Sequence, residues 1–153
     1  MQKGINQANL VKQTEPSTSL LLYLALFFAA TASAGSLFFS EVMKLPPCVL
    51  CWYQRIAMYP LVLILGVSIV RKDHGHIYYG LPLALIGLAI AIYHNLLYYK
   101  IIPESIVPCT SGISCTSRQI EWLGFITIPL MSLFAFSLIS AFLFAQVKIR
   151  SSK

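Results

Sequence analysis

Charged residues are scarce in this chain. Only 10% of its 153 residues are Asp, Glu, Lys or Arg, whereas soluble domains carry about 25%. Hydrophobic residues make up 58% of the sequence. A soluble protein of this size cannot hide so much apolar surface, but a membrane protein can, because lipid is its solvent. The composition therefore excludes an ordinary soluble domain and predicts an integral membrane protein.

Familiar cofactor signatures are also missing. The chain has no Gly-x-Gly-x-x-Gly sequence, no P-loop and no cysteine spacing typical of iron–sulfur ligation. His94 is the one histidine placed well inside an apolar run, so a haem held by two histidines is not expected. Little chain is left for a soluble flavin domain.

Four apolar runs reach the roughly 20 residues that a helix needs to cross a bilayer. They are Leu20–Phe39, Trp52–Val70, Ile77–Tyr99 and Trp122–Val147. The sequence thus predicts an all-α membrane protein, a four-transmembrane-helix bundle over residues 19–147. A polar N-terminal arm (1–18) and a basic tail (148–153) flank it. Ala32-Ser33-Ala34 resembles a signal-peptidase site, but the run continues past it, which favours a retained helix with small packing residues.

The positions of Lys and Arg predict the orientation of the bundle. Seven of the eleven lie at the termini or in the turn between the second and third runs: Lys3, Lys12, Arg71, Lys72, Lys148, Arg150 and Lys153. The other two connecting segments hold only Lys44, Lys100 and Arg118. Positive charge gathers on the cytoplasmic side, so both termini are expected inside. Residues 41–51 and 100–121 are then extracytoplasmic loops of a multi-pass protein in the plasma (inner) membrane.

All four cysteines lie in these two outer segments. Cys48 and Cys51 are in the first, and Cys109 and Cys115 are in the second. Cysteine used as a small hydrophobic residue would be scattered through the apolar runs. Disulfides persist outside the cytoplasm, so two pairs at the water edge of a bundle predict two dithiol–disulfide couples that exchange electrons.

The spacing within each pair supports redox chemistry and leaves two alternatives open. Pro46-Pro47 favours a helix that starts at about Cys48. The dipole of this helix would stabilise a thiolate in its first turn. A small, exposed ring between Cys109 and Cys115 suits an exchangeable disulfide. One alternative is a Cys₄ zinc site, although the second pair is spaced more widely than is usual. The other is a small bundle protein whose disulfides only brace its loops.

Arg55 and His94 are the candidate residues for holding an electron acceptor. Arg55 follows Cys51 by one helical turn, so it shares a helix face with the cysteine pair, and an arginine at this depth indicates function. The alternative is an arginine that snorkels to lipid headgroups. His94 is expected near the same level, where it could donate a proton to a reduced acceptor or form a helix–helix hydrogen bond.

A lipid-soluble quinone, menaquinone or ubiquinone, is the acceptor that remains after these exclusions. A quinone needs no dedicated fold, only a groove in a helix bundle with polar contacts near the membrane interface.

The residues around the first cysteine pair resemble a known family signature. Pro47-Cys48-Val49-Leu50-Cys51-Trp52-Tyr53-Gln54-Arg55-Ile56 is similar to the signature of the DsbB family of membrane disulfide-forming oxidoreductases. Three further segments resemble the BdbC branch of this family: Met58-Tyr59-Pro60, Tyr93-His94 and Gly124-Phe125-Ile126-Thr127-Ile128-Pro129. The resemblance covers all four apolar runs.

The resemblance implies a thiol:quinone oxidoreductase that reoxidises a thioredoxin-like extracytoplasmic partner, of DsbA or BdbD type, and so drives disulfide bond formation. By matching motif positions, Cys51 would face the quinone and Arg55 would contact it. Cys109 would receive the partner's thiolate, and Cys115 would pass electrons to Cys48 through a transient inter-loop disulfide. Two features depart from the better-known Gram-negative pattern: the second cysteine pair is closer together, and Gln54 stands where some relatives carry an acid.

Overall fold

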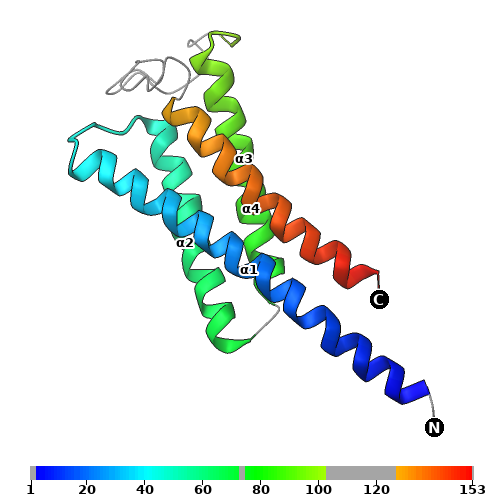
Figure 1. Cartoon of the computed structure of the whole chain (residues 1–153). Coiled ribbons are helices and arrows are strands. Elements are labelled where there is room, and N and C mark those ends of the chain that lie inside the picture. Colours follow the sequence, from blue (N-terminus) through cyan, green and yellow to red (C-terminus); the bar gives the residue numbers. More distant parts are fainter. Residues whose placement is uncertain (1–2, 73–74, 103–126, 153) are drawn as a thin grey trace.

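The computed structural model describes residues 3–72, 75–102 and 127–152, with side chains from residue 18 onward. Four helices make up almost all of this: α1 (Lys3–Glu41), α2 (Val49–Arg71), α3 (His76–Tyr98) and α4 (Ile128–Ser151) (Figure 1). The described residues contain no strand. The prediction of an all-α bundle is confirmed.

Each helix contains a stretch long and apolar enough to cross a membrane. In α1 the stretch is Thr18–Glu41, and the other three helices qualify over their whole length. The shortest stretches have 23 residues, about 35 Å of helix, which exceeds the roughly 30 Å hydrocarbon core of a bilayer. Large apolar side chains such as Phe27, Leu63 and Val70 are mostly exposed on the bundle, as lipid-facing residues are. The chain is a multi-pass membrane protein, and the predicted spans are confirmed with their ends moved by a few residues.

The polar residues expected to form a separate N-terminal arm are continuous with the first span. α1 begins at Lys3 and runs to Glu41, so residues 3–17 extend the helix beyond its apolar part.

The four helices pack in a ring around a main core, with a smaller buried cluster beside Cys48. α1 lies against α2 and α4, and α3 lies against the same two helices. Small residues let the helices approach closely, and Ala25, Ala29, Ala84 and Ala91 are fully buried. The middle of the core is filled by larger side chains, among them Leu61, Leu65, Phe136, Ile139 and Leu143.

α3 and α4 pack tightly at Gly87. A β-carbon at this position would overlap the ring of Phe136. Glycine is therefore required here by space, because the Phe136 ring lies directly against the α3 backbone.

The fourth helix begins later than the apolar run Trp122–Val147 predicts. That run places Pro129 inside the span, where proline would bend the helix, but α4 begins at Ile128 and Pro129 lies in its first turn. Thr127 caps this helix, and its side-chain oxygen accepts the backbone N–H of Leu130 at 3.4 Å. The first turn tolerates proline because its N–H groups have no partner within the helix. Pro60, in contrast, does lie inside α2.

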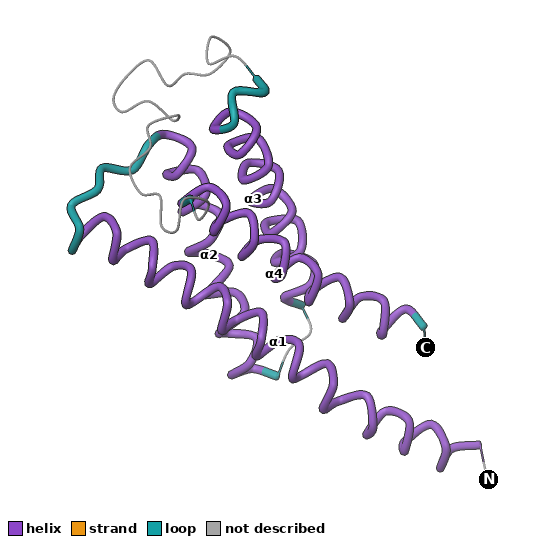
Figure 2. Tube along the Cα trace, turned by 45° about the horizontal axis from the view of Figure 1, so that its top comes forward, coloured by secondary structure: helices purple, strands orange, loops and turns teal. Residues whose placement is uncertain are grey.

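α2 begins, with Cys48 as its N-cap, at one end of the bundle, and both termini lie toward the other end (Figures 1 and 2). α1 ends at this cysteine end, and α2 ends and α3 begins at the opposite end. α3 ends and α4 begins at the cysteine end, so the segment that joins them leaves from there. Cys109 and Cys115 belong to that segment and lie outside the described residues.

Candidate functional site

Cys48 and Cys51 form the first turn of α2. Cys48 is the N-cap residue, with an extended backbone, and its sulfur accepts the backbone N–H of Cys51 at 3.4 Å. The two sulfurs are 2.8 Å apart, and both cysteines are free thiols. The expectation of a helix that begins at about Cys48 is confirmed. Both reactive sulfurs therefore sit at the positive end of a helix dipole.

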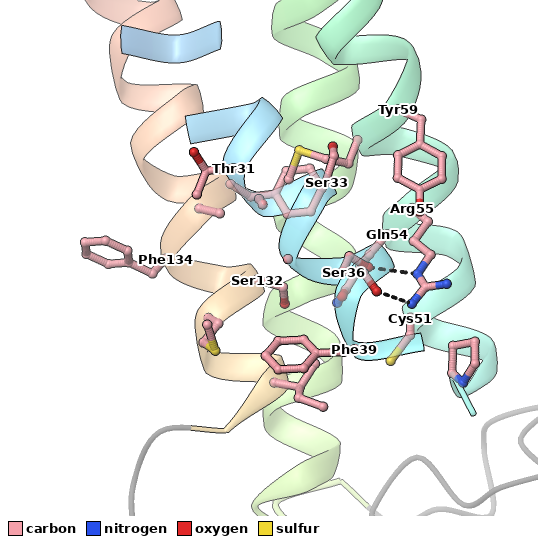
Figure 3. Close-up of a pocket in the computed structure, with 18 of the residues that line it drawn as sticks. Thr31, Ser33, Ser36, Phe39, Cys51, Gln54, Arg55, Tyr59, Ser132 and Phe134 are labelled. Atoms are coloured by element: carbon pink, nitrogen blue, oxygen red, sulfur yellow. Dashed lines mark hydrogen bonds between the residues drawn. The ribbon is translucent and has the colours of Figure 1, made fainter. Parts of the chain in front are cut away.

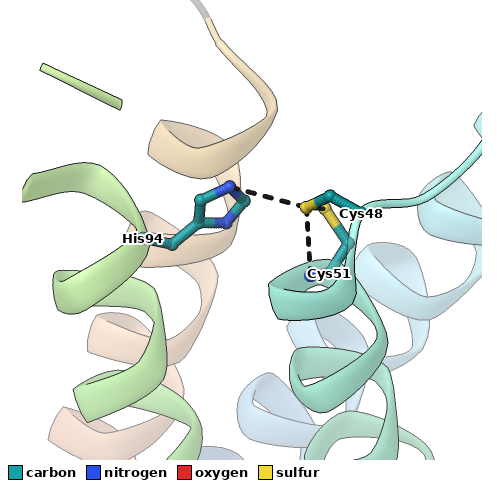
Figure 4. A group of neighbouring side chains, drawn as sticks. All are labelled: Cys48, Cys51 and His94. Carbon is teal, nitrogen blue, oxygen red and sulfur yellow. Dashed lines mark hydrogen bonds between the residues drawn. The ribbon is translucent and has the colours of Figure 1, made fainter. Parts of the chain in front are cut away.

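His94 of α3 lies against Cys48 (Figure 4). Its Nε2 atom is 3.7 Å from the Cys48 sulfur, and its Nδ1 atom is 3.3 Å from Nε2 of Gln54. The His94 side chain is only 2% exposed. Because an amide nitrogen can only donate, this arrangement makes Nδ1 the acceptor. We therefore assign the imidazole proton to Nε2, from which it points at the Cys48 sulfur.

These contacts favour negative charge on Cys48, which lies just outside the α2 span. The hydrogen bond from the Cys51 side chain, with a smaller contribution from the hydrogen bond of His94, lowers the pKa of Cys48 to about 4, although burial opposes the shift. Thiolate is the nucleophilic form of cysteine, so Cys48 carries the more stable thiolate of the reduced pair.

Arg55 is held by α1. Its Nε donates to the Ser36 hydroxyl at 2.8 Å, and an Nη donates to the Ser36 carbonyl oxygen at 2.9 Å. Its guanidinium carbon also lies 5.7 Å from the centre of the Trp52 ring, within the range of a cation–π contact. The structure thus gives Arg55 protein partners, and the guanidinium keeps further N–H groups for a ligand.

A cavity of about 380 Å³ lies between α1, α2 and α4 beside these residues (Figure 3). Cys51 and Arg55 line it, together with mostly apolar side chains such as Phe39, Met58 and Met131. The cavity thus combines an apolar wall with one reactive sulfur and one cation.

Two hydroxyl groups in the wall of this cavity have no hydrogen-bond partner among the described residues. They belong to Ser33 and Tyr59, and both oxygen atoms are buried. A buried polar group left unpaired costs free energy, so these hydroxyls are available to hydrogen-bond to a ligand or water in the cavity.

The structure divides the predicted site residues into two groups. Cys51 and Arg55 line the cavity, whereas His94 contacts Cys48 and is not among the lining residues. The cysteine pair therefore lies between the cavity and the histidine. The predicted roles of Cys109 and Cys115 concern residues outside the described part of the chain.

Sequence reasoning missed three residues of the site. Ser33 was considered only as part of a possible signal-peptidase site and Ser36 not at all, although a spacing of three places their two hydroxyls on one helix face. Tyr59 follows Arg55 by four residues and therefore shares its face. The spacing of Ser33 and Ser36, and that of Arg55 and Tyr59, are the sequence signals that could have identified these residues.

Comparison with known proteins identifies the family. Residues 17–146 match the family model described as "Disulfide bond formation protein DsbB". The chain belongs to the DsbB family. Disulfide bond formation protein C of Bacillus subtilis (strain 168) is 48% identical over 126 residues, covering 81% of this chain and 90% of the relative. Probable disulfide formation protein C 1 of Bacillus anthracis is 43% identical over 135 residues, covering 88% and 96%.

Membership of the DsbB family confirms the resemblance seen in the sequence, including its BdbC-like branch, and implies an oxidoreductase of disulfide bond formation. The SPbeta prophage-derived disulfide bond formation protein B of Bacillus subtilis is also 46% identical over 121 residues, 78% of each chain. No solved structure matches this chain.

Proposed function

We propose that this DsbB-family protein is a protein-dithiol:quinone oxidoreductase of the plasma membrane. It reoxidises the dithiol of a thioredoxin-like extracytoplasmic partner, of DsbA or BdbD type, and passes the electrons to a membrane quinone. The observation that carries the proposal is the placement of Cys51 and Arg55 in the wall of one apolar cavity. A disulfide that only braced a loop would need neither the cavity nor the cation.

The cavity suits a quinone head group. Its volume of about 380 Å³ falls within the range of roughly 300–1,000 Å³ typical of small-molecule sites. Arg55 keeps its charge under all relevant conditions, so it can stabilise negative charge on a quinone oxygen. The unpartnered hydroxyls of Ser33 and Tyr59 can donate to a carbonyl oxygen. A bound quinone, menaquinone or ubiquinone, would supply an acceptor for two electrons and two protons.

The cysteine pair supplies both electrons when its disulfide forms. Cys48 is held as the thiolate by the Nε2–H of His94, which is directed at its sulfur. Cys51 keeps its proton, lies 2.8 Å from the Cys48 sulfur and lines the cavity. Formation of the bond between the two sulfurs releases two electrons and the Cys51 proton, and a quinone in the cavity would accept them together with a second proton from water.

The second cysteine pair would deliver the electrons. In this scheme the partner's thiolate attacks Cys109, and Cys115 passes the electrons to Cys48 through a transient inter-loop disulfide. The scheme is supported by the charge bias of the sequence, which favours an extracytoplasmic side for both cysteine segments. It is also supported by the bundle, in which the segment with Cys109 and Cys115 leaves from the same end as Cys48.

Trapping of the partner tests this function. Exchange proceeds through a mixed disulfide, which accumulates when the resolving thiol is absent. Cys115→Ser should therefore accumulate a covalent complex between Cys109 and a thioredoxin-like partner, visible on non-reducing gels and by mass spectrometry of the joined peptides. Cys109→Ser is the matched control and should accumulate none. A partner trapped on Cys48 or Cys51 would reverse the proposed order.

A further inference from the structure

Three possible metal ligands meet at the outer end of the bundle. The sulfurs of Cys48 and Cys51 and a ring nitrogen of His94 all lie within 4.8 Å of one another. We propose that the reduced cysteine pair and His94 form a Cys₂His site for Zn²⁺. This site is distinct from the Cys₄ alternative considered from the sequence, because it replaces the second cysteine pair with a histidine from α3.

The distances are close to those of a zinc site. Zinc–sulfur bonds of about 2.3 Å and zinc–nitrogen bonds of about 2.0–2.1 Å in a tetrahedron put sulfur and nitrogen about 3.6 Å apart and two sulfurs about 3.8 Å apart. The Cys48 sulfur and His94 Nε2 are 3.7 Å apart. The two sulfurs, at 2.8 Å, must separate by about 1 Å. Rotation of the Cys51 side chain toward the cavity that it lines can supply this movement.

Gln54 provides the support that a metal-binding histidine requires. The second ring nitrogen of such a histidine is almost always fixed by a hydrogen bond, and Nδ1 of His94 already faces the Gln54 amide at 3.3 Å. With zinc on Nε2, Nδ1 carries the proton, so the amide must turn and offer Oε1. Gln54 is 7% exposed, which keeps water from competing for this bond.

The ligand types select zinc over the common hard cations. Thiolates and imidazole favour zinc, whereas Mg²⁺ and Ca²⁺ require oxygen ligands. Three protein ligands leave the fourth position of the tetrahedron for water, as in open zinc sites.

Zinc binding would depend on the redox state of the pair and would compete with electron transfer. A Cys48–Cys51 disulfide has no thiolate to offer, so only the reduced protein can bind the ion. Once bound, zinc occupies both thiolates and keeps them from forming the disulfide. This inference goes beyond the proposed function and does not require it, because metal binding is measured without quinone or partner.

The experiment uses Co²⁺ as a spectroscopic probe. The full chain with Cys109→Ser and Cys115→Ser is purified in detergent, reduced with a phosphine, and titrated with Co²⁺ and then with Zn²⁺. One equivalent of Co²⁺ should produce the sulfur-to-cobalt charge-transfer band and the visible bands of a tetrahedral thiolate site, and Zn²⁺ should abolish them. The same protein with an oxidised pair should show no such bands.

Matched variants identify the nitrogen ligand. His94→Gln should weaken binding by at least about tenfold, because losing a ligand costs no less than losing the hydrogen-bond partner of a ligand, which typically costs about 10–100-fold. His76→Gln is the control, since His76 is equally buried but bonds to Gln146 in the other half of the bundle, and it should leave the affinity unchanged. Gln54→Glu should tighten binding, because a carboxylate accepts the Nδ1–H more strongly, and Gln54→Leu should weaken it.

Three results would overturn the inference. One is the absence of the thiolate–cobalt bands in the reduced protein. Another is a metal affinity of His94→Gln equal to that of the parent protein. If His94→Gln fails to fold, unchanged metal affinity in both Gln54 variants has the same meaning. The third is binding by the wild-type chain that disappears in the Cys109→Ser, Cys115→Ser background, which would restore the Cys₄ site.

Discussion

Arg55 donates two hydrogen bonds to a single residue of another helix, Ser36. One bond goes to the Ser36 side chain and the other to its backbone carbonyl, so the planar guanidinium is fixed in orientation as well as in position. An arginine that served only to reach lipid headgroups would not need this fixation. The pair therefore connects α1 and α2 beside the cavity that Cys51 lines.

The fixed guanidinium gives a prediction for quinone use. Arg55→Lys keeps the charge but loses the planar fork, so the apparent KM for quinone should rise roughly tenfold, a loss of about 1.4 kcal/mol. Steady-state assays with reduced partner and varied quinone measure this effect. Arg71→Lys, an exposed change at the far end of α2, is the control. An unchanged KM in Arg55→Lys would remove Arg55 from the quinone site.

The acidity of Cys48 gives a prediction for pH. Its pKa is lowered from 9.0 to about 4, so the alkylation rate of Cys48 should stay nearly constant from about pH 8 to about pH 5 and fall near pH 4. His94→Gln should raise this midpoint, because it removes one stabilising hydrogen bond. Peptide mapping of iodoacetamide adducts in the Cys109→Ser, Cys115→Ser background gives the rate. A midpoint near 9 in the reduced parent would contradict the assigned thiolate.

The same shift has a consequence for stability. A depressed pKa in the folded state contributes stability that is fully present above the unfolded value and is lost as the pH falls through the folded value. The Cys48 contribution in the reduced protein should therefore decline between about pH 9 and about pH 4. Oxidation of the pair removes the titrating group and should abolish this part of the pH dependence.

The contact between α3 and α4 predicts a sharp difference between two glycines. Gly87→Ala would push a methyl group into the Phe136 ring and should destabilise the bundle by about 1–3 kcal/mol, as overpacking does. Gly66→Ala meets nothing within 4 Å and should be neutral or stabilising. Thermal unfolding in detergent compares the two variants. Equal stability of both would show that the helices are not as close as described.

The sequence predicts the spans well because lipid imposes length and apolarity directly. It also predicts the helix start at Cys48, since Pro46-Pro47 is a local signal. The mutual rotation of the helices could not be predicted, because spans surrounded by lipid are apolar on most sides and show little amphipathic contrast. The contact of His94 with Cys48, and that of Arg55 with Ser36, depend on this rotation.

The place of Pro129 shows a related difficulty. An apolar run marks where a helix fits, but it does not mark the residue at which the helix begins. Thr127 caps α4, and this short-range capping signal was outweighed by the longer hydrophobic run. The serines of α1 could not be recognised as site residues for two reasons. Their direction depends on the rotation of the helix, and small hydroxyl residues also suit close helix packing.

Electron transfer from Cys48 and Cys51 to a quinone can be followed in one anaerobic measurement. The reduced Cys109→Ser, Cys115→Ser protein is mixed with a soluble quinone analogue, and quinone absorbance is followed while the free thiols are counted. We expect loss of one equivalent of quinone for each Cys48–Cys51 disulfide formed, and no loss when Cys51→Ser is also introduced. A disulfide that formed without quinone consumption, or quinone consumption that survived Cys51→Ser, would contradict this electron transfer.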